Sequence, residues 1–168
     1  MDPLTEGEIR SSFVNCSKGD TKRLNLPRDL ADRPWDDLDF LGWTDPSLGG
    51  RAYIVVPADI PVSGADGPVG VALRYESGGP RKAQMCTICL TTHTGSDVSL
   101  MTAAKVGDAG RRGNTVGTYM CTDLACSLYA RNKKRPALGN RYREELSPEE
   151  KALRVRENLA AFLLRVTG

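Results

Sequence analysis

Two short pairs of cysteines constrain this chain more than any other feature of its sequence. Cys86 and Cys89 are separated by two residues, Cys121 and Cys126 by four, and the two pairs by 31 residues. A fifth cysteine, Cys16, lies far from both pairs, and an odd count without a secretory signal argues against a disulfide scaffold. Paired thiols at these spacings are typical of a structural zinc site, in which four sulfurs lie about 2.3 Å from the metal.

The segments around the two pairs predict how such a site is built. A Cys-x-x-Cys turn directs two thiolates inward, and the second pair is expected to place Cys121 at the end of a strand and Cys126 in the first turn of a helix over 123–133. A helix N-terminus offsets part of the negative charge of four thiolates. The Cys86–Cys89 turn (the knuckle) is followed by a hairpin and then a helix. This order is the layout of a treble-clef zinc finger, with Zn2+ held by Cys86, Cys89, Cys121 and Cys126.

One alternative ligand set replaces a cysteine with His93, the only histidine of the chain. Because four cysteines are available, His93 is expected instead to lie beside the site or on the surface, and Cys16 to be a buried or partly buried free thiol. Four thiolate ligands leave the metal no open position for water. The sequence also lacks a nucleotide-binding loop, a nucleophile elbow and a zinc-protease motif. The pattern therefore favours a protein that is not an enzyme.

Hydrophobic periodicity predicts an α+β fold with a small antiparallel sheet, an N-terminal helix and a C-terminal amphipathic helix. Strands are expected at 51–56, 68–75, 98–104 and 115–120, with the first two paired antiparallel and a mobile hairpin tip at 107–114. Thr5 and Glu8 form a capping box that starts a helix, which is expected to end near residues 15–19. Residues 36–43 are expected to hold a helical turn closed by Gly42.

A further helix with clear start signals is predicted at the C-terminal end. Ser147 is its N-cap, Pro148 its first residue, and Glu150 completes a capping box. Apolar residues at 152, 155, 159, 162 and 166 form one stripe, which is expected to pack on the same domain. Three segments result: an N-terminal helix and β lobe (1–80), a zinc finger (81–135), and a basic linker with the C-terminal helix (136–168).

Composition excludes some classes of protein and leaves one charged segment to explain. The 168 residues contain no apolar run long enough to span a bilayer, and the acidic N-terminus is not a secretory signal, so the cytoplasm is the expected compartment. The net charge is only +2, but residues 101–143 carry nine basic and two acidic groups. Such a segment is either a solvated face or a contact surface for an acidic partner or a polyanion. The candidate partner-binding residues, expected to form one basic face of the finger, are Arg111, Arg112, Arg131, Lys133, Lys134 and Arg135.

Four stretches of the chain resemble one known family. They are Phe13 to Pro27, Trp35 to Pro46, Met85 to His93, and Asn114 to Tyr129. Together they are similar to the C-terminal domain of elongation factor G-binding proteins, the family of fusidic-acid resistance proteins, and the composition resembles its actinobacterial branch. The resemblance covers roughly residues 10 to 165, and the two cysteine segments are its most specific part.

The resemblance implies a four-cysteine treble clef that binds elongation factor G through the zinc-finger lobe. It also implies that binding promotes release of the factor from the ribosome, including when fusidic acid holds it there, by shifting a conformational equilibrium of the target. It implies neither a membrane nor a small-molecule substrate. Resistance proteins of this family carry a helical domain before this region, where only one short helix is found here, so a housekeeping role in translation stands beside drug protection.

A second hypothesis follows from the charge rather than from the resemblance. The basic residues could contact RNA or DNA directly, as in a nucleic-acid-binding zinc finger. That hypothesis predicts binding to naked nucleic acid with a steep dependence on salt. Few aromatic side chains lie near the basic residues in the sequence, so recognition of single strands by stacking has little support.

Overall fold

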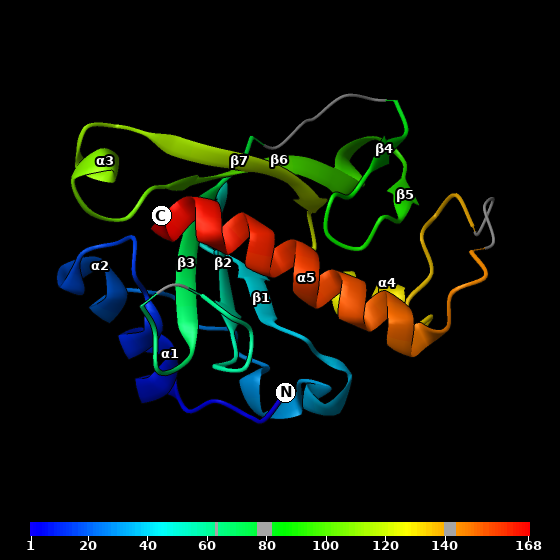
Figure 1. Ribbon diagram of the computed structural model, residues 1–168, viewed down its shortest axis with the longest axis horizontal. Coiled ribbons are helices and arrows are strands. Elements are labelled where there is room, and N and C mark those ends of the chain that lie inside the picture. Colours follow the sequence, from blue (N-terminus) through cyan, green and yellow to red (C-terminus); the bar gives the residue numbers. More distant parts are fainter. Residues whose placement is uncertain (63, 77–81, 140–143) are drawn as a thin grey trace.

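A five-stranded antiparallel sheet forms the middle layer of the protein (Figure 1). The computed structural model describes residues 1–62, 64–76, 82–139 and 144–168, so the predicted break at 77–80 and the end of the predicted linker lie outside the described residues. The sheet has the strand order β1-β2-β3-β6-β7. These strands are β1 (Leu41–Thr44), β2 (Arg51–Val56), β3 (Val69–Arg74), β6 (Val98–Ala104) and β7 (Thr115–Cys121).

The strand predictions are confirmed, including the antiparallel pairing of β2 with β3. β6 and β7 form a regular hairpin, from Val98 opposite Cys121 to Ala104 opposite Thr115. β3 meets β6 at a single register pair, Arg74 opposite Thr102. The two halves of the sheet therefore diverge, and Figure 1 shows β6 and β7 running across the direction of β1, β2 and β3. The sheet thus joins strands from both sides of residue 80.

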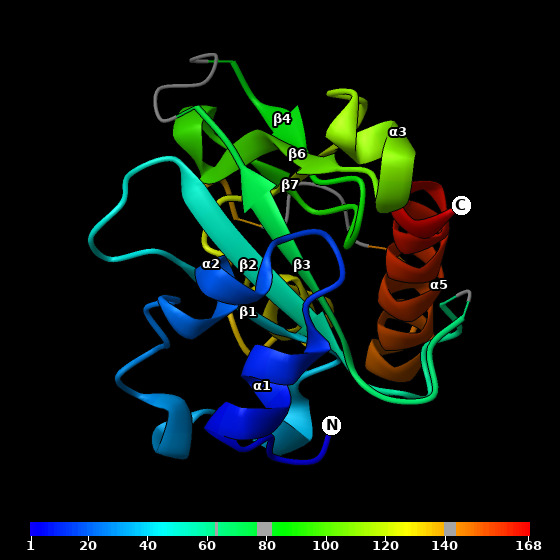
Figure 2. The same cartoon turned by 90° about the vertical axis from the view of Figure 1, so that its left-hand side faces the viewer.

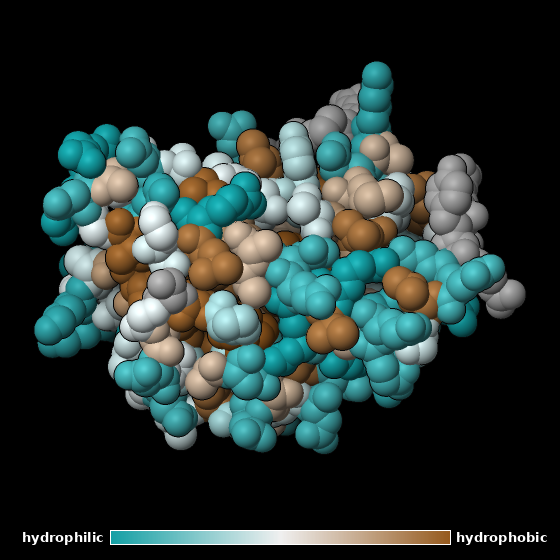
Figure 3. All heavy atoms as spheres, viewed as in Figure 1, coloured by the Kyte–Doolittle hydropathy of each residue, from teal (hydrophilic) through white to brown (hydrophobic). Residues whose placement is uncertain are grey.

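One face of the sheet is covered by the long C-terminal helix α5 (Pro148–Thr167). Its predicted start is confirmed, since Ser147 and Glu150 form both hydrogen bonds of the capping box. All five residues of the predicted apolar stripe are buried, and four of them join one core with the inward residues of β2, β3, β6 and β7. The predicted packing on the same chain is therefore confirmed. Figure 3 shows the outer surface of this helix covered by hydrophilic side chains near its N-terminal end.

Residues 1–40 cover the opposite face, over β1, β2 and β3 (Figure 2). They contain α1 (Glu6–Ser12), α2 (Lys18–Lys22) and two 3-10 turns, Leu30–Asp32 and Trp35–Asp37. The capping box of α1 is confirmed, but the helix ends earlier than predicted. It ends because Phe13 turns to an extended conformation and bridges to Gly70, where a Cβ atom would lie only 2.5 Å from Ser12 Oγ.

Two segments differ locally from what the sequence predicts. Gly42 does not close a helical turn but lies in β1, which follows the 3-10 turn at Trp35–Asp37. The hairpin tip predicted at 107–114 does connect β6 with β7, but it contains a short helix, α3 (Gly107–Arg111), that the sequence did not predict. Sequence periodicity missed both because neither segment is long enough to show a period. No helix in the described ranges combines the length and the hydrophobicity needed to cross a membrane.

Candidate metal centre

The four paired cysteines converge into one buried cluster. Each contributes a sulfur, and the four sulfurs lie within 4.8 Å of one another. Cys86 Sγ lies 3.7 Å from Cys126 Sγ, and Cys89 Sγ lies 3.6 Å from Cys121 Sγ. These distances are far too long for disulfides, but they match the edge of about 3.8 Å expected for a tetrahedron with Zn–S bonds of about 2.3 Å. The predicted ligand set is thus assembled as a tetrahedral zinc site.

The first pair lies on a tight turn between β4 (Gln84–Met85) and β5 (Thr92–His93), which form a small two-stranded sheet. The Cys86 N–H donates to the Thr91 carbonyl at 3.0 Å, and the Leu90 N–H donates to the Cys86 carbonyl at 2.9 Å. Leu90 takes a left-handed conformation, with φ of 58°. These bonds close the turn, so that both sulfurs point inward, as a zinc knuckle requires.

The second pair lies where β7 meets α4 (Cys126–Ala130). Cys121 is the last residue of the strand and Cys126 the first residue of the helix, as predicted. The helix is shorter than the predicted span of 123–133, because Leu124 takes a left-handed conformation with φ of 56° before it and Asn132 with φ of 57° after it. The knuckle is tied to this strand by the Thr87 N–H, which donates to the Tyr119 carbonyl at 2.8 Å.

Two polar side chains of α5 hold the knuckle from the other side. Asn158 donates to the Ile88 carbonyl at 3.0 Å, and Arg154 donates to the Cys89 carbonyl at 3.3 Å. Sequence reasoning missed this contact, although the spacing of four residues places both side chains on one face of a helix. Arg154 also pairs with Glu144 at 2.8 Å. Helix α5 is therefore bound to the backbone of the cysteine turn.

The electrostatics of the cluster favour a divalent cation. Contacts with the sulfurs of Cys121, Cys86 and Cys89, together with burial, raise the pKa of Cys126 far above its usual value. Four buried thiolates cannot coexist without a positive charge between them. Zn2+ supplies that charge and takes four thiolates in a closed tetrahedral site. The donor set and its geometry therefore fit a structural zinc ion, which would hold the knuckle to β7 and α4.

His93 lies beside the cluster rather than in it. Its ring is buried, with Nε2 3.4 Å from Cys121 Sγ, and it packs edge-on against Tyr129 with ring centroids 4.6 Å apart. Tyr129 in turn donates its hydroxyl hydrogen to Asp123 at 2.9 Å. Burial, followed by this bond to Asp123, raises the pKa of Tyr129. The alternative ligand set containing His93 is therefore not formed.

The six basic residues predicted to form one face are divided between two ends of the molecule. Arg111 and Arg112 lie on or next to α3, at the tip of the β6–β7 hairpin. Residues 131–135 follow α4, at the opposite end of the molecule (Figure 1). Three of the latter four are already paired with carboxylates. Arg131 binds Asp39, Lys133 binds Asp37, and Lys134 binds Asp123.

Arg131 is bound more tightly than the others. Both terminal nitrogens of its guanidinium donate to the buried Asp39 carboxylate, at 2.5 and 2.9 Å. The hydrogen bond to Asp39 raises the pKa of Arg131 despite its partial burial. The Asp39 N–H also donates to Ser127 Oγ at 2.9 Å. Arg131 therefore joins α4 to residues 1–40, and its charge is compensated by Asp39 within the protein.

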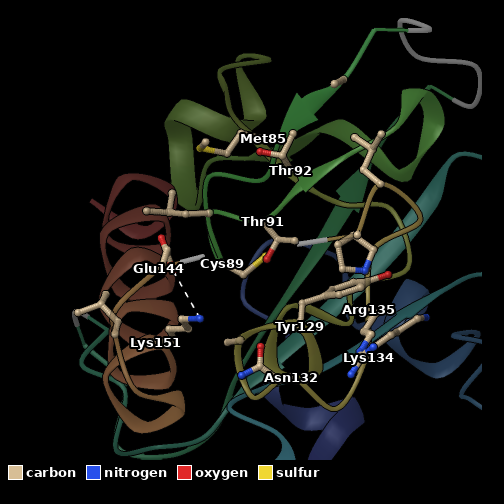
Figure 4. A pocket seen from close by; sticks show the side chains of 17 residues that line it. Met85, Cys89, Thr91, Thr92, Tyr129, Asn132, Lys134, Arg135, Glu144 and Lys151 are labelled. Atoms are coloured by element: carbon tan, nitrogen blue, oxygen red, sulfur yellow. Dashed lines mark ion pairs between the residues drawn. The ribbon is translucent and has the colours of Figure 1, made fainter. Parts of the chain in front are cut away.

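A cavity of about 680 Å³ opens between the knuckle and the segment that follows α4 (Figure 4). Met85, Cys89 and Thr92 line it on the knuckle side, and Figure 4 shows Lys134 and Arg135 on the side opposite Glu144 and Lys151. Met85 is 52% exposed. This cavity includes Cys89 of the metal centre in its lining, and it combines exposed apolar surface with cationic groups.

Cys16 lies outside the metal centre, as predicted. It is a partly buried free thiol that lines a different cavity. Burial, with a smaller contribution from the charge of Asp20, raises the pKa of Cys16 to about 11.

The fold and this site define the chain as an α+β protein that contains a four-cysteine treble-clef zinc finger. Residues 8–166 match the family model described as the FBP C-terminal treble-clef zinc-finger. The chain therefore belongs to this family, the elongation factor G-binding proteins to which its cysteine segments are similar. No curated protein matches the chain at a significant level.

Proposed function

We propose that the protein binds elongation factor G and promotes its release from the ribosome. The observation that carries this proposal is the family match over residues 8–166 together with the complete four-cysteine cluster. The cluster is closed and fits a structural ion, so the finger supplies a shaped surface rather than a reaction centre. We accordingly propose a binding protein that acts in the cytoplasm and is not an enzyme.

The end of the molecule around the zinc site is the better docking surface of its two basic ends. Met85 and Leu146 are exposed apolar groups beside the cavity, and Arg135 is an exposed cation with no ion pair in the described part of the chain. Lys134 lies next to it but shares its charge with Asp123. Apolar groups with a rim of positive charge suit an acidic partner surface, on which apolar contact gives affinity and charge speeds the encounter.

The test is a pull-down of purified elongation factor G by the zinc-loaded protein, at several salt concentrations. The variant Met85→Asp/Arg135→Glu changes the zinc end, and Arg111→Glu/Arg112→Glu changes the α3 end, so each serves as the control for the other. We expect the first variant to weaken binding at least tenfold and the second to weaken it less. A chelated sample should not bind.

Other outcomes would overturn parts of the proposal. Absence of a complex at micromolar protein would refute binding to elongation factor G. Retention of naked RNA with a steep loss of affinity in salt would favour the nucleic-acid hypothesis instead. If Arg111→Glu/Arg112→Glu weakens the complex more than the other variant does, the docking surface lies at α3 rather than at the zinc site. A translation assay with fusidic acid, run with and without the protein, separates drug protection from a housekeeping role.

A further inference from the structure

Two arginines occupy directly opposed positions on neighbouring strands. Arg51 of β2 pairs in register with Arg74 of β3, and both side chains are exposed on the same face of the sheet. Neither forms an ion pair within the described ranges, and the residues outside those ranges include no aspartate or glutamate. Like charges directly opposite each other destabilise a sheet. The pair therefore carries a cost that the folded chain itself does not offset.

The two guanidinium groups line a cavity of about 830 Å³ at the point where the halves of the sheet diverge. Residues of α2, β2, β3 and β6 contribute to its lining. The size is that of a pocket for a small ligand. Tyr53 lines the same cavity. Burial and the hydrogen bond to Asp45 raise the pKa of Tyr53, and the nearby Arg51 guanidinium opposes that shift.

The acidic residues of the cavity do not neutralise the arginine pair. Asp45 accepts hydrogen bonds from the N–H groups of Ser47 and Leu48, from the Asn25 amide and from the Tyr53 hydroxyl. Asp20 is paired with a different arginine, Arg23, at 3.0 Å. Other walls are neutral, since Asn15, Thr102 and Thr115 line the same space. The cavity therefore presents two arginines without an ion pair, beside the Asp20–Arg23 pair and an Asp45 carboxylate that is bound by neutral donors.

The number of guanidinium groups decides which anion fits. One arginine fork already satisfies the two oxygens of a carboxylate side-on. A phosphate monoester has three free oxygens and up to two negative charges, so it can accept hydrogen bonds from both forks at once. We propose that the cavity between Arg51 and Arg74 binds a phosphate monoester, of the kind carried by a mononucleotide or by the end of an RNA chain. This site lies on the face of the sheet opposite α5 and is separate from the zinc centre.

The test is calorimetric titration of the zinc-loaded protein at low salt with four probes. They are inorganic phosphate, adenosine 5′-monophosphate, adenosine, and a short RNA with or without a 5′-phosphate. We expect saturable binding of the monophosphate and of the 5′-phosphorylated RNA, and none of adenosine. Arg51→Gln and Arg74→Gln should each raise the dissociation constant at least tenfold, and Arg28→Gln, at an exposed arginine elsewhere, should leave it unchanged.

Each contrary result has a clear meaning. Absence of saturable binding by every phosphate probe would overturn the proposal, as would an unchanged dissociation constant in the Arg51→Gln/Arg74→Gln variant. Equal binding of RNA with and without the 5′-phosphate would show that the site recognises the phosphodiester backbone and not a phosphate monoester. Bound zinc, measured on each variant, verifies that a loss of binding does not arise from unfolding. Binding to elongation factor G by the same variants shows whether the two activities are independent.

Discussion

At the sulfur of Cys121, the metal centre has a neighbour that can donate a hydrogen bond. His93 Nε2 lies 3.4 Å from that sulfur, within reach of an N–H···S contact. Partners of this kind orient a ligand and reduce the negative charge that it carries. The ring itself is held by Tyr129, whose hydroxyl is bound to Asp123. A short series of contacts therefore leads from the zinc ligand to the surface of the finger.

Replacing His93 should weaken zinc binding without removing a ligand. His93→Phe keeps a ring against Tyr129 but has no donor, so we expect the zinc dissociation constant to rise about 10- to 100-fold. His93→Gln retains a donor and should lose less. Competition with a chromophoric chelator measures both. Equal zinc affinity for His93→Phe and the unmodified protein would show that the contact with Cys121 contributes nothing.

Cys16 should react slowly as a thiol and should make stability depend on alkaline pH. Its pKa is raised from 9.0 to about 11, so the folded protein holds the thiol proton more tightly than the unfolded chain does. This contribution is complete below pH 9 and is lost as the pH rises toward 11. Denaturant unfolding across that range should show falling stability, with a smaller slope in Cys16→Ser. A Cys16→Ser protein with an unchanged slope would assign the effect to other groups.

Short elements of the fold are placed by contacts rather than by their own propensity. β1 has four residues and α4 has five, below the length at which a helix or strand is stable by itself. β1 meets the turn that precedes α4 at Gly42, where a Cβ atom would lie 2.6 Å from Leu124 Cβ and 3.0 Å from Phe40 Cε2. The glycine thus lets the edge of the sheet approach the turn between Cys121 and Cys126.

Gly42→Ala should test this approach directly. The added methyl group overlaps Leu124, so either β1 or the cysteine turn must move, and we expect a loss of about 1–3 kcal/mol of unfolding free energy. Gly49→Ala is the matched control, because a Cβ there meets nothing within 4 Å. Urea unfolding of the zinc-loaded proteins measures both. Equal stability of the two variants would mean that Leu124 moves aside freely.

At the scale of the whole molecule, the zinc centre lies where the layers meet. α5 holds the knuckle through Asn158 and Arg154, and Arg131 binds α4 to Asp39 in the N-terminal segment. The four cysteines also belong to the main hydrophobic core. The finger is therefore not an appendage, and its metal should stabilise the sheet and both helical layers together.

Removal of the zinc ligands should consequently unfold more than the finger. Cys86→Ser/Cys121→Ser should lose near-stoichiometric zinc and cooperative thermal unfolding, because metal binding contributes directly to folding free energy. Cys16→Ser should retain both. Metal analysis and calorimetry on the same samples give the two readouts. A double variant that still unfolds cooperatively would show that the sheet and α5 fold without the metal.

Features with a strong local signal were predictable from the sequence. The capping boxes at Thr5 and Ser147, four strands of the sheet and the ligand set needed only spacing and periodicity. Features that depend on distant contacts were not. Nothing near Gly42 in the sequence indicates that Leu124 packs against it, and nothing near Arg131 indicates that Asp39 takes its charge.

Residue spacing and hydrophobic periodicity are enough to predict the main features of this protein: four thiolates at zinc-finger spacing, an antiparallel sheet, and an amphipathic helix that covers it. Cysteine spacing and hydrophobic periodicity depend only on residues close together in the sequence, so they can be recognised without knowledge of the fold. Which charged side chains remain unpaired, by contrast, depends on contacts that exist only in the folded protein. In the folded protein Arg131 pairs with Asp39, and the residues of the expected basic face lie at two ends of the molecule. Arg51 lies opposite Arg74 without an acidic partner. Electrostatic pairing depends on distances across the fold, which sequence separation does not encode.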